Sequence, residues 1–208
     1  MFRPLFRGLT RPLFVEGFGS RDQCERWVYN FDGVNDFAQF AERLIDLDSG
    51  AFSVKWHQME AVMPPFGAAN IFVQADFDEP FDSREFYIRW ARFLGDFTLE
   101  VMHGGINTSI ADAFRPSARY EVAYGAGSLV VLRDDVVIYN QARTIGPARN
   151  ATLPVFGGAQ GIYYNIRING HLYPINNPTS NIQRSIPDNG NPLTLFNTNQ
   201  GRWSKIPC

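Results

Sequence analysis

The sequence holds few of the groups that build disulfide scaffolds, membrane spans or secretion signals. Only two of its 208 residues are cysteines, Cys24 and Cys208, near opposite ends, and no Cys-x-x-Cys spacing occurs. Two cysteines could form one disulfide between the ends of the chain or remain free, and we expect free thiols. No apolar run approaches the ~20 residues of a membrane span, and the basic N-terminus lacks the apolar core of a cleaved signal.

An excess of charge of one sign is also missing. The formal net charge is -2, so no global electrostatic field favours nucleic acid. The three histidines, His57, His103 and His171, are far apart and lack zinc-type spacing, so we expect surface or strand positions for them. The sequence contains no Gly-x-Ser-x-Gly elbow, no phosphate loop and no Glu-x-Asp-x-x-Glu carboxylate pattern. We therefore predict no enzymatic activity, no catalytic residue, no cofactor and no metal site.

What the chain has in quantity is aromatic residues in short alternating runs. It contains 18 Phe, 8 Tyr and 4 Trp within a hydrophobic content of 45%, enough for a sizeable core. Runs with a period of two residues, bounded by Gly, Pro, Asn or Asp, predict strands over 52–57, 71–76, 97–102 and 162–169. The segments 37–45 and 82–94 fit helical spacing as well, and we predict strands in both places.

Two segments carry explicit turn chemistry. Between Phe31 and Phe37 the Asp-Gly and Asn-Asp pairs tolerate the left-handed backbone angles of a tight reversal, which we interpret as a hairpin. Between Arg119 and Asn140 three strands alternate with two turns, which predicts a meander. The last two strands of the meander are apolar on both faces. This pattern predicts a central position in the sheet or cover by a second layer.

These pieces, in this order, resemble a concanavalin A-like, laminin-G-like jelly roll. The resemblance rests on the aromatic-Asp-Gly-x-x-Asp-aromatic opening, the strand Phe52–Trp56, the meander and the glycine turn after Phe156, within about 28–168. It implies an all-β fold, a jelly-roll sandwich of two sheets over residues 21–208. An extended docking arm and hinge would precede the sandwich over residues 1–20.

The arm is a short repeat, Arg-Pro-Leu-Phe, Arg-Gly-Leu-Thr and again Arg-Pro-Leu-Phe, followed by a glycine-rich hinge. Its prolines favour extended backbone and spoil the amphipathic helix of a mitochondrial presequence. Its few apolar side chains cannot offset the entropy of ordering, so it is either a disordered basic tail or a peptide that orders on a partner. The docking residues of such a peptide would be Arg3, Leu5, Phe6, Arg11, Leu13 and Phe14.

The arm, the sandwich and the tail at 193–206 together resemble structural proteins of bacteriophages and prophages. This resemblance implies a virion protein, a capsid decoration or a tail- or fibre-associated component, made in the host cytoplasm and oligomeric in the particle. Its partners would be other virion proteins and host-surface glycans, without nucleic acid or membrane insertion. The alternative is a carbohydrate-binding module for host-surface glycans, and a glycan-cleaving enzyme is the third hypothesis.

Three further groups are candidates for ligand binding. Trp56, Trp90 and Trp203 could form a sugar-stacking platform, although tryptophans at alternating positions more often fill a core. The polar stretch Asn176–Asn199 is either a binding loop region or a set of surface connections. Calcium is the one cofactor alternative, and turn chemistry is the competing interpretation that we favour for the same residues. The candidate calcium ligands are Asp32, Asn35, Asp36, Asp46 and Asp48.

Overall fold

A computed structural model describes residues 24–42, 44–45, 51–74, 86–93, 96–144, 154–187 and 190–207. These residues form sixteen strands and one short 3-10 helix, η1 (Gln200–Arg202), without any α-helix. The predicted all-β fold class is therefore confirmed. The arm over 1–20 and its six docking residues lie outside the described residues and remain a prediction. In the described part of the chain no helix is long and apolar enough to cross a membrane.

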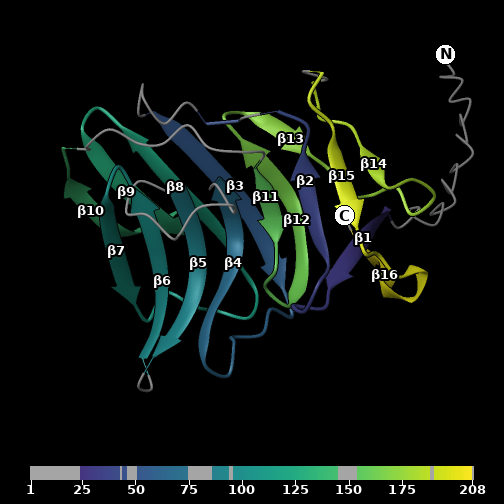
Figure 1. Cartoon of the computed structure of the whole chain (residues 1–208), viewed down its shortest axis with the longest axis horizontal. Helices are drawn as coiled ribbons and strands as arrows, with labels where there is room; N and C mark the ends of the chain where they lie inside the picture. The colour runs from purple at the N-terminus through teal and green to yellow at the C-terminus, as the bar shows by residue number, and fades with distance from the viewer. Residues whose placement is uncertain are drawn as a thin grey trace, which may run out of the picture.

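The strands form two sheets in which every pairing is antiparallel. The first sheet has the order β10 (Val136–Ala142), β9 (Ser128–Arg133), β8 (Ala118–Gly125), β3 (Phe52–Met59), β12 (Gly161–Ile168), β1 (Glu25–Phe31), β16 (Trp203–Pro207), with β13 (His171–Tyr173) beside β12. The second has the order β14 (Ile182–Gln183), β15 (Leu193–Phe196), β2 (Phe37–Phe40), β11 (Val155–Gly157), β4 (Gly67–Gln74), β5 (Phe86–Phe93), β6 (Asp96–His103), β7 (Ile106–Ala111). The edge strands β7 and β10 lie at one end of the sandwich, and β14, β15 and β16 lie at the other (Figure 1).

The core lies between the two sheets and is rich in aromatic rings. In β3, as the alternation predicts, Phe52, Val54 and Trp56 are buried while the residues between them face outward. Trp56 stacks on Tyr120 of β8, with ring centroids 5.2 Å apart, and Trp90 of β5 packs edge-on against the same Tyr120. Because Trp90 belongs to the second sheet, these rings join the two layers. Truncating one such buried tryptophan typically costs about 3–5 kcal/mol.

The segment from Phe31 to Phe37 connects the two sheets and is not a hairpin. Strand β1 pairs with β12 and β16, whereas β2 pairs with β15 and β11 in the other sheet. Phe31 enters the core from the first sheet and Phe40 from the second, so the chain has to cross between layers. The predicted turn is confirmed, because the Asp32 carboxylate accepts backbone hydrogen bonds within the connection. The predicted strand pairing was wrong.

The predicted meander is confirmed as β8, β9 and β10. The predicted central or covered position of its last strand, β10, is wrong. This strand forms the edge of the first sheet, and Val136 and Val137 are 64% and 54% exposed. Its apolar residues reflect the preference of β-branched side chains for extended backbone rather than burial on both faces. Ile138 and Tyr139 alone in this strand pack partly against the core cluster.

A β-bulge changes which side chains of β12 reach the core. The alternation of Ile162, Tyr164, Ile166 and Ile168 predicts one common face. The register between β12 and β3 shifts after Tyr164, and Asn165 has a positive φ of 51°. As a result Tyr163 is buried in the core, and Tyr164 is half-buried and in contact with His57 of β3.

Cys24 is disulfide-bonded, so the expectation of free thiols is wrong. The physical reason lies in the pairing of β1 with β16, which places Glu25 opposite Pro207. The beginning and the end of the sandwich are therefore neighbours in the same sheet. The other cysteine of the sequence, Cys208, directly follows Pro207 and lies outside the described residues.

Candidate functional site

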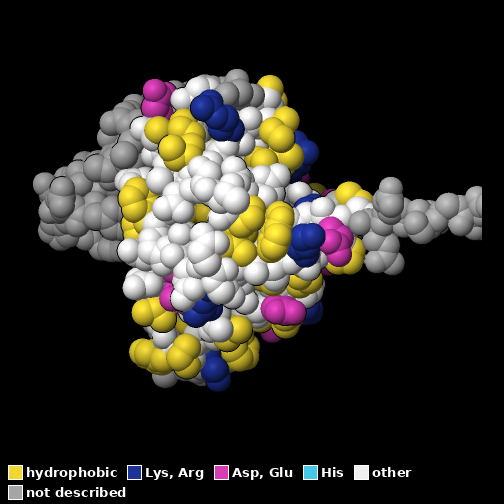
Figure 2. Space-filling view, turned by 90° about the vertical axis from the view of Figure 1, so that its right-hand side faces the viewer, with side chains coloured by type: hydrophobic (Ala, Val, Ile, Leu, Met, Phe, Trp, Pro, Cys, Tyr) yellow, Lys and Arg dark blue, Asp and Glu magenta, His cyan; other side chains and the backbone are white. Residues whose placement is uncertain are grey.

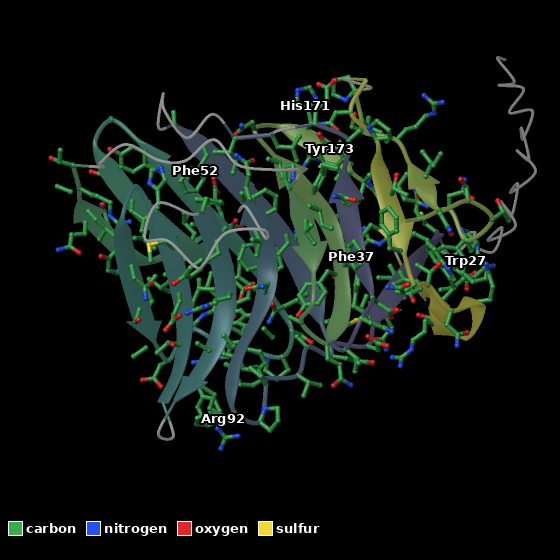
Figure 3. All side chains as sticks on the ribbon, viewed as in Figure 1. Trp27, Phe37, Phe52, Arg92, His171 and Tyr173 are labelled. Carbon is green, nitrogen blue, oxygen red and sulfur yellow. The ribbon has the colours of Figure 1, made fainter. Side chains whose placement is uncertain are left out.

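An aromatic pair lies on the outer face of the second sheet. Phe37 of β2 and Phe196 of β15 are cross-strand partners, with ring centroids 5.0 Å apart and planes inclined by 12°. Their neighbours Ala38 and Leu195 point into the core, so strand alternation turns both rings outward. Phe196 is 38% exposed. Figure 3 shows Phe37 in the part of the sheet close to β15.

A hollow of about 390 Å³ opens beside the Phe37 ring. On the side of β2 away from β15, Phe37 is paired with Gly157 of β11, which also lines the hollow. Gly157 has a φ of +109°, and a Cβ there would lie 3.1 Å from the Phe31 ring. The residues that line the hollow are Val34, Asn35, Asp36, Phe37, Gln39, Asn70, Val73, Val155, Gly157 and Gly158.

Three side-chain amides border the hollow and are free to meet a ligand. The amides of Asn35, Gln39 and Asn70 make no side-chain hydrogen bond within the described ranges. Each amide offers both donors and an acceptor, which suits a partner that carries hydroxyl groups. We refer to Phe37, Phe196 and these three amides as the aromatic shelf.

The floor of the aromatic shelf is fixed by a buried hydrogen-bond chain. The backbone N–H of Asn199 donates to the Tyr29 hydroxyl at 3.0 Å, and that hydroxyl donates to Asp36 Oδ2 at 2.9 Å. Burial, reinforced by the Asp36 carboxylate, raises the pKa of Tyr29 to about 12, so the hydroxyl remains a donor. Asp36 is therefore engaged, and the ligand-facing groups of the shelf are uncharged.

The two described carboxylates of this segment, those of Asp32 and Asp36, accept hydrogen bonds in and around the turn. Asp32 Oδ1 accepts from the backbone N–H groups of Val34, Asn35 and Asp36 at 2.8, 3.1 and 3.3 Å. Burial alone would raise the pKa of the Asp32 carboxyl, but these three donors together bring that pKa below its ordinary value. Among the described residues no group of three or more potential metal ligands occurs. Asp46 and Asp48 lie outside those residues.

A polar cluster on the outer face of the first sheet pairs mainly within itself. The Arg26 guanidinium lies 4.4 Å from the Tyr164 ring centroid and donates to Asn165 Oδ1 at 3.1 Å. The Asn165 amide nitrogen lies 3.2 Å from His57 Nδ1. Burial, followed by the charges of Arg119 and Arg26, lowers the pKa of His57, so this imidazole is neutral at pH 7. The adjoining hollow measures about 100 Å³, below the usual size of a ligand site.

The polar stretch Asn176–Asn199 is mainly a set of surface connections. It borders a hollow of about 460 Å³, but the Gln183 side chain there is used by the backbone of the loop itself. This side chain accepts from the N–H groups of Asn176 and Asn177 and donates to the carbonyls of Asn177 and Ser180. Phe196 is the residue of this stretch that contributes to the aromatic shelf.

The tryptophans and histidines do not form a common site. Trp56 and Trp90 are fully buried, and Trp203 packs edge-on against Tyr29 with centroids 5.2 Å apart, so these three form no sugar-stacking platform. His103 is buried, whereas His171, the first residue of β13, lies at the upper edge of the molecule (Figure 3).

Sequence reasoning missed the aromatic shelf. Its signal was present in the alternation of Phe37 with Ala38 and of Phe196 with Leu195. The pairing of two strands so distant in sequence was not visible in either segment alone.

Comparisons with known proteins support the fold. No model of a known protein family matches the sequence, and no curated protein sequence matches it either. A proposed carbohydrate-binding protein from Bacteroides ovatus superposes with a TM-score of 0.62 at 9% identity, covering 88% of this chain and 60% of that protein. The heptameric SAP-like pentraxin of Limulus polyphemus superposes with a TM-score of 0.50 at 11% identity, covering 69% and 75% of the two chains.

These likenesses, together with the two antiparallel sheets, confirm the predicted concanavalin A-like jelly-roll sandwich. The chain spans about three fifths of the length of the Bacteroides protein. At such low identity the comparisons define the fold, and the function has to be argued from the site.

Proposed function

We propose that this chain is a non-enzymatic carbohydrate-binding protein and that a sugar ring binds on the aromatic shelf. One observation carries the proposal: one ring of a stacked aromatic pair lines a hollow whose three amides make no side-chain hydrogen bond to the described residues. A sugar ring has an apolar C–H face that packs on an aromatic ring and a rim of hydroxyl groups that pair with amides. At about 390 Å³ the hollow falls in the size range of ligand sites.

The charge around the shelf favours a neutral sugar. Asp36, the one ionisable residue that lines the hollow in the described part of the chain, is 2% exposed and bonded to Tyr29. The end of the molecule that carries β14, β15 and β16 is also mostly uncharged, with scattered hydrophobic side chains and isolated charges (Figure 2). A neutral glycan would bind here without the desolvation of an unpaired charge.

The comparison with the Bacteroides protein supports the same class of ligand, because that protein is described as a proposed carbohydrate-binding protein. This comparison supports carbohydrate as the class of ligand, and the glycan screen described next identifies the sugar.

The test compares two phenylalanines of equal exposure. Phe196 on the shelf and Phe97 of β6 are both 38% exposed on the second sheet. The full chain is screened on an array of neutral glycans, and the affinity for the best glycan is measured by calorimetry. We expect Phe196→Ser to weaken binding at least about tenfold, since it removes the exposed ring of the aromatic pair and the support of the Phe37 ring, and Phe97→Ser to leave it unchanged.

Two results would refute the proposal. One is a folded protein, with intact β-type circular dichroism, that binds no glycan on the array. The other is binding that Phe196→Ser leaves intact. Release of shortened saccharides from a bound polysaccharide would instead favour the glycan-cleaving hypothesis.

The virion role is a second proposal, and it rests on the sequence alone. Neither of the two structures named above is a phage protein. The role depends on the arm, so deletion of residues 1–14 should leave a folded sandwich that no longer incorporates into particles. Normal incorporation of the shortened chain would refute the virion role without affecting the aromatic shelf.

A further inference from the structure

A second hollow lies at the opposite end of the sandwich from the aromatic shelf. It measures about 500 Å³ and opens between β7 and β10, the edge strands of the two sheets. Figure 1 shows these strands at one end of the molecule and β15 toward the other. Hydroxyl and amide side chains predominate in its lining, which consists of Ile106, Asn107, Thr108, Ser109, Tyr139, Gln141, Ala142, Arg143 and Thr144.

Arg143 brings a buried positive charge to this hollow. The residue is 9% exposed, and its backbone is held by a hydrogen bond from its N–H to the Gly127 carbonyl at 2.7 Å. The Tyr124 hydroxyl donates to the Arg143 carbonyl at 3.1 Å. One guanidinium nitrogen donates to the Thr108 hydroxyl, and the other terminal nitrogen is buried and has no hydrogen-bond partner among the described residues. The side chain is thus positioned, with a free donor left over.

Nothing in the described ranges neutralises this guanidinium. No ion pair involves Arg143 there, and no Asp or Glu lines the hollow. His103 feels the charge of Arg143, and its pKa is lowered to about 4, by burial first and by this charge second, so its ring is neutral at pH 7. A buried, unpaired charge is costly for a fold, so a guanidinium of this kind at the border of a hollow points to an anionic ligand.

We propose that Arg143 binds the carboxylate of an acidic sugar residue in this hollow. A guanidinium presents parallel N–H donors that match the two oxygens of a carboxylate. Asn107, Ser109 and Thr144 make no side-chain hydrogen bond to described residues and supply donors and acceptors for ring hydroxyl groups. The site is separate from the aromatic shelf, so either one can exist without the other.

The test uses three probes with the full chain. D-glucuronate carries both the ring and the carboxylate, D-glucose has the ring with a neutral group in place of the carboxylate, and acetate has the carboxylate without a ring. Calorimetry should show glucuronate binding, with glucose and acetate each at least about tenfold weaker. Equal binding of glucose and glucuronate, or no binding of glucuronate, would overturn the proposal. Equal binding of acetate would reduce the site to a carboxylate site without sugar recognition and overturn it as well.

Variants assign the binding to Arg143. Arg143→Gln should weaken glucuronate binding at least about tenfold, while Arg167→Gln, on the outward side of β12, should not. Because the guanidinium has no counter-charge among the described residues, Arg143→Gln without ligand should be at least as stable to heat as the parent chain. Arg143→Lys keeps the positive charge but lacks the planar guanidinium, and it replaces the test if Arg143→Gln fails to fold. It should bind glucuronate with intermediate affinity.

Glucuronate binding that survives Arg143→Gln, or that Arg143→Lys leaves at full strength, would overturn the proposal. The variant Phe196→Ser should leave glucuronate binding unchanged. Loss of glucuronate binding in Phe196→Ser would place the acidic sugar on the aromatic shelf and overturn the assignment to Arg143.

Discussion

His103 shows how a single residue can couple the stability of this protein to pH. It is fully buried, and in the described part of the chain neither ring nitrogen has a hydrogen-bond partner. The rings of Phe52 and Tyr124 surround it, with centroids 4.9 and 4.7 Å away. Burial first, and the charge of Arg143 second, lower the pKa of His103 to about 4. The folded protein therefore resists protonation of this ring.

We predict that acid destabilises the fold through His103. Between the ordinary histidine pKa of 6.5 and the folded value of about 4, the unfolded chain binds the proton and the folded chain does not. The free energy of unfolding should therefore fall by about 3 kcal/mol as the pH falls through this window, and rise again as the pH is raised. Urea denaturation at pH 7 and pH 4 measures the change.

The variant His103→Leu should reduce this pH dependence by the same amount, because leucine does not titrate. His171→Gln, at a less buried position, serves as the control and should keep the dependence of the parent chain. Equal pH dependence in the parent chain and in His103→Leu would contradict the prediction.

At Gly157, next to the aromatic shelf, both the backbone conformation and the lack of space disfavour a side chain. Its φ is +109°, and a Cβ would meet the Phe31 ring at 3.1 Å and the Phe37 Cα at 3.3 Å. We predict that Gly157→Ala lowers the free energy of unfolding by about 1–3 kcal/mol, measured by chemical denaturation. Gly127→Ala is the control, since Gly127 also has a positive φ but no atom within 4 Å of the added Cβ. An equal loss in both variants would show that contact with Phe31 adds nothing.

At the scale of elements, the connection between β1 and β2 is tied to the C-terminal segment by the Tyr29 hydroxyl. This group accepts from the Asn199 N–H and donates to Asp36. We predict that Tyr29→Phe costs about 1–3 kcal/mol of stability, because it leaves a buried carboxylate with one partner fewer. Tyr164→Phe is the matched control, since its hydroxyl makes no hydrogen bond within the described residues. A loss no larger than that of the control, measured by thermal denaturation, would argue against the hydrogen-bond chain.

The elements also show what the sequence could and could not predict. Runs such as Phe52–Trp56 gave strands at the right places, because alternation is a local property of the chain. The partners of a strand depend on residues far away, so the connection after Phe31 was interpreted as a hairpin and β10 was placed too centrally. The aromatic shelf was missed for the same reason, since Phe37 and Phe196 meet only after β2 and β15 have paired. Arg143 gave no sequence signal, because its exceptional feature is an unpaired donor created by packing.

For the whole molecule, the disulfide of Cys24 closes the chain where the sandwich begins and ends. Such a long closed loop restricts the unfolded chain strongly, by up to about 5 kcal/mol in the entropic model. We predict that a reducing agent lowers the melting temperature of the protein and that Cys24→Ser lowers it to a similar extent. The agent should have no further effect on the variant. An unchanged melting temperature after complete reduction would contradict this view.

The neighbourhood of Glu25 and Pro207 also determines how this sandwich can be combined with other proteins. Since β1 and β16 run antiparallel and meet at these residues, the two ends of the described fold leave the molecule at one point. A module of this kind can be inserted into a surface loop of a host protein with little disturbance of either partner, because the loop ends need not move apart. The same geometry lets the sandwich branch from a longer chain while it is attached through both of its ends at a single point.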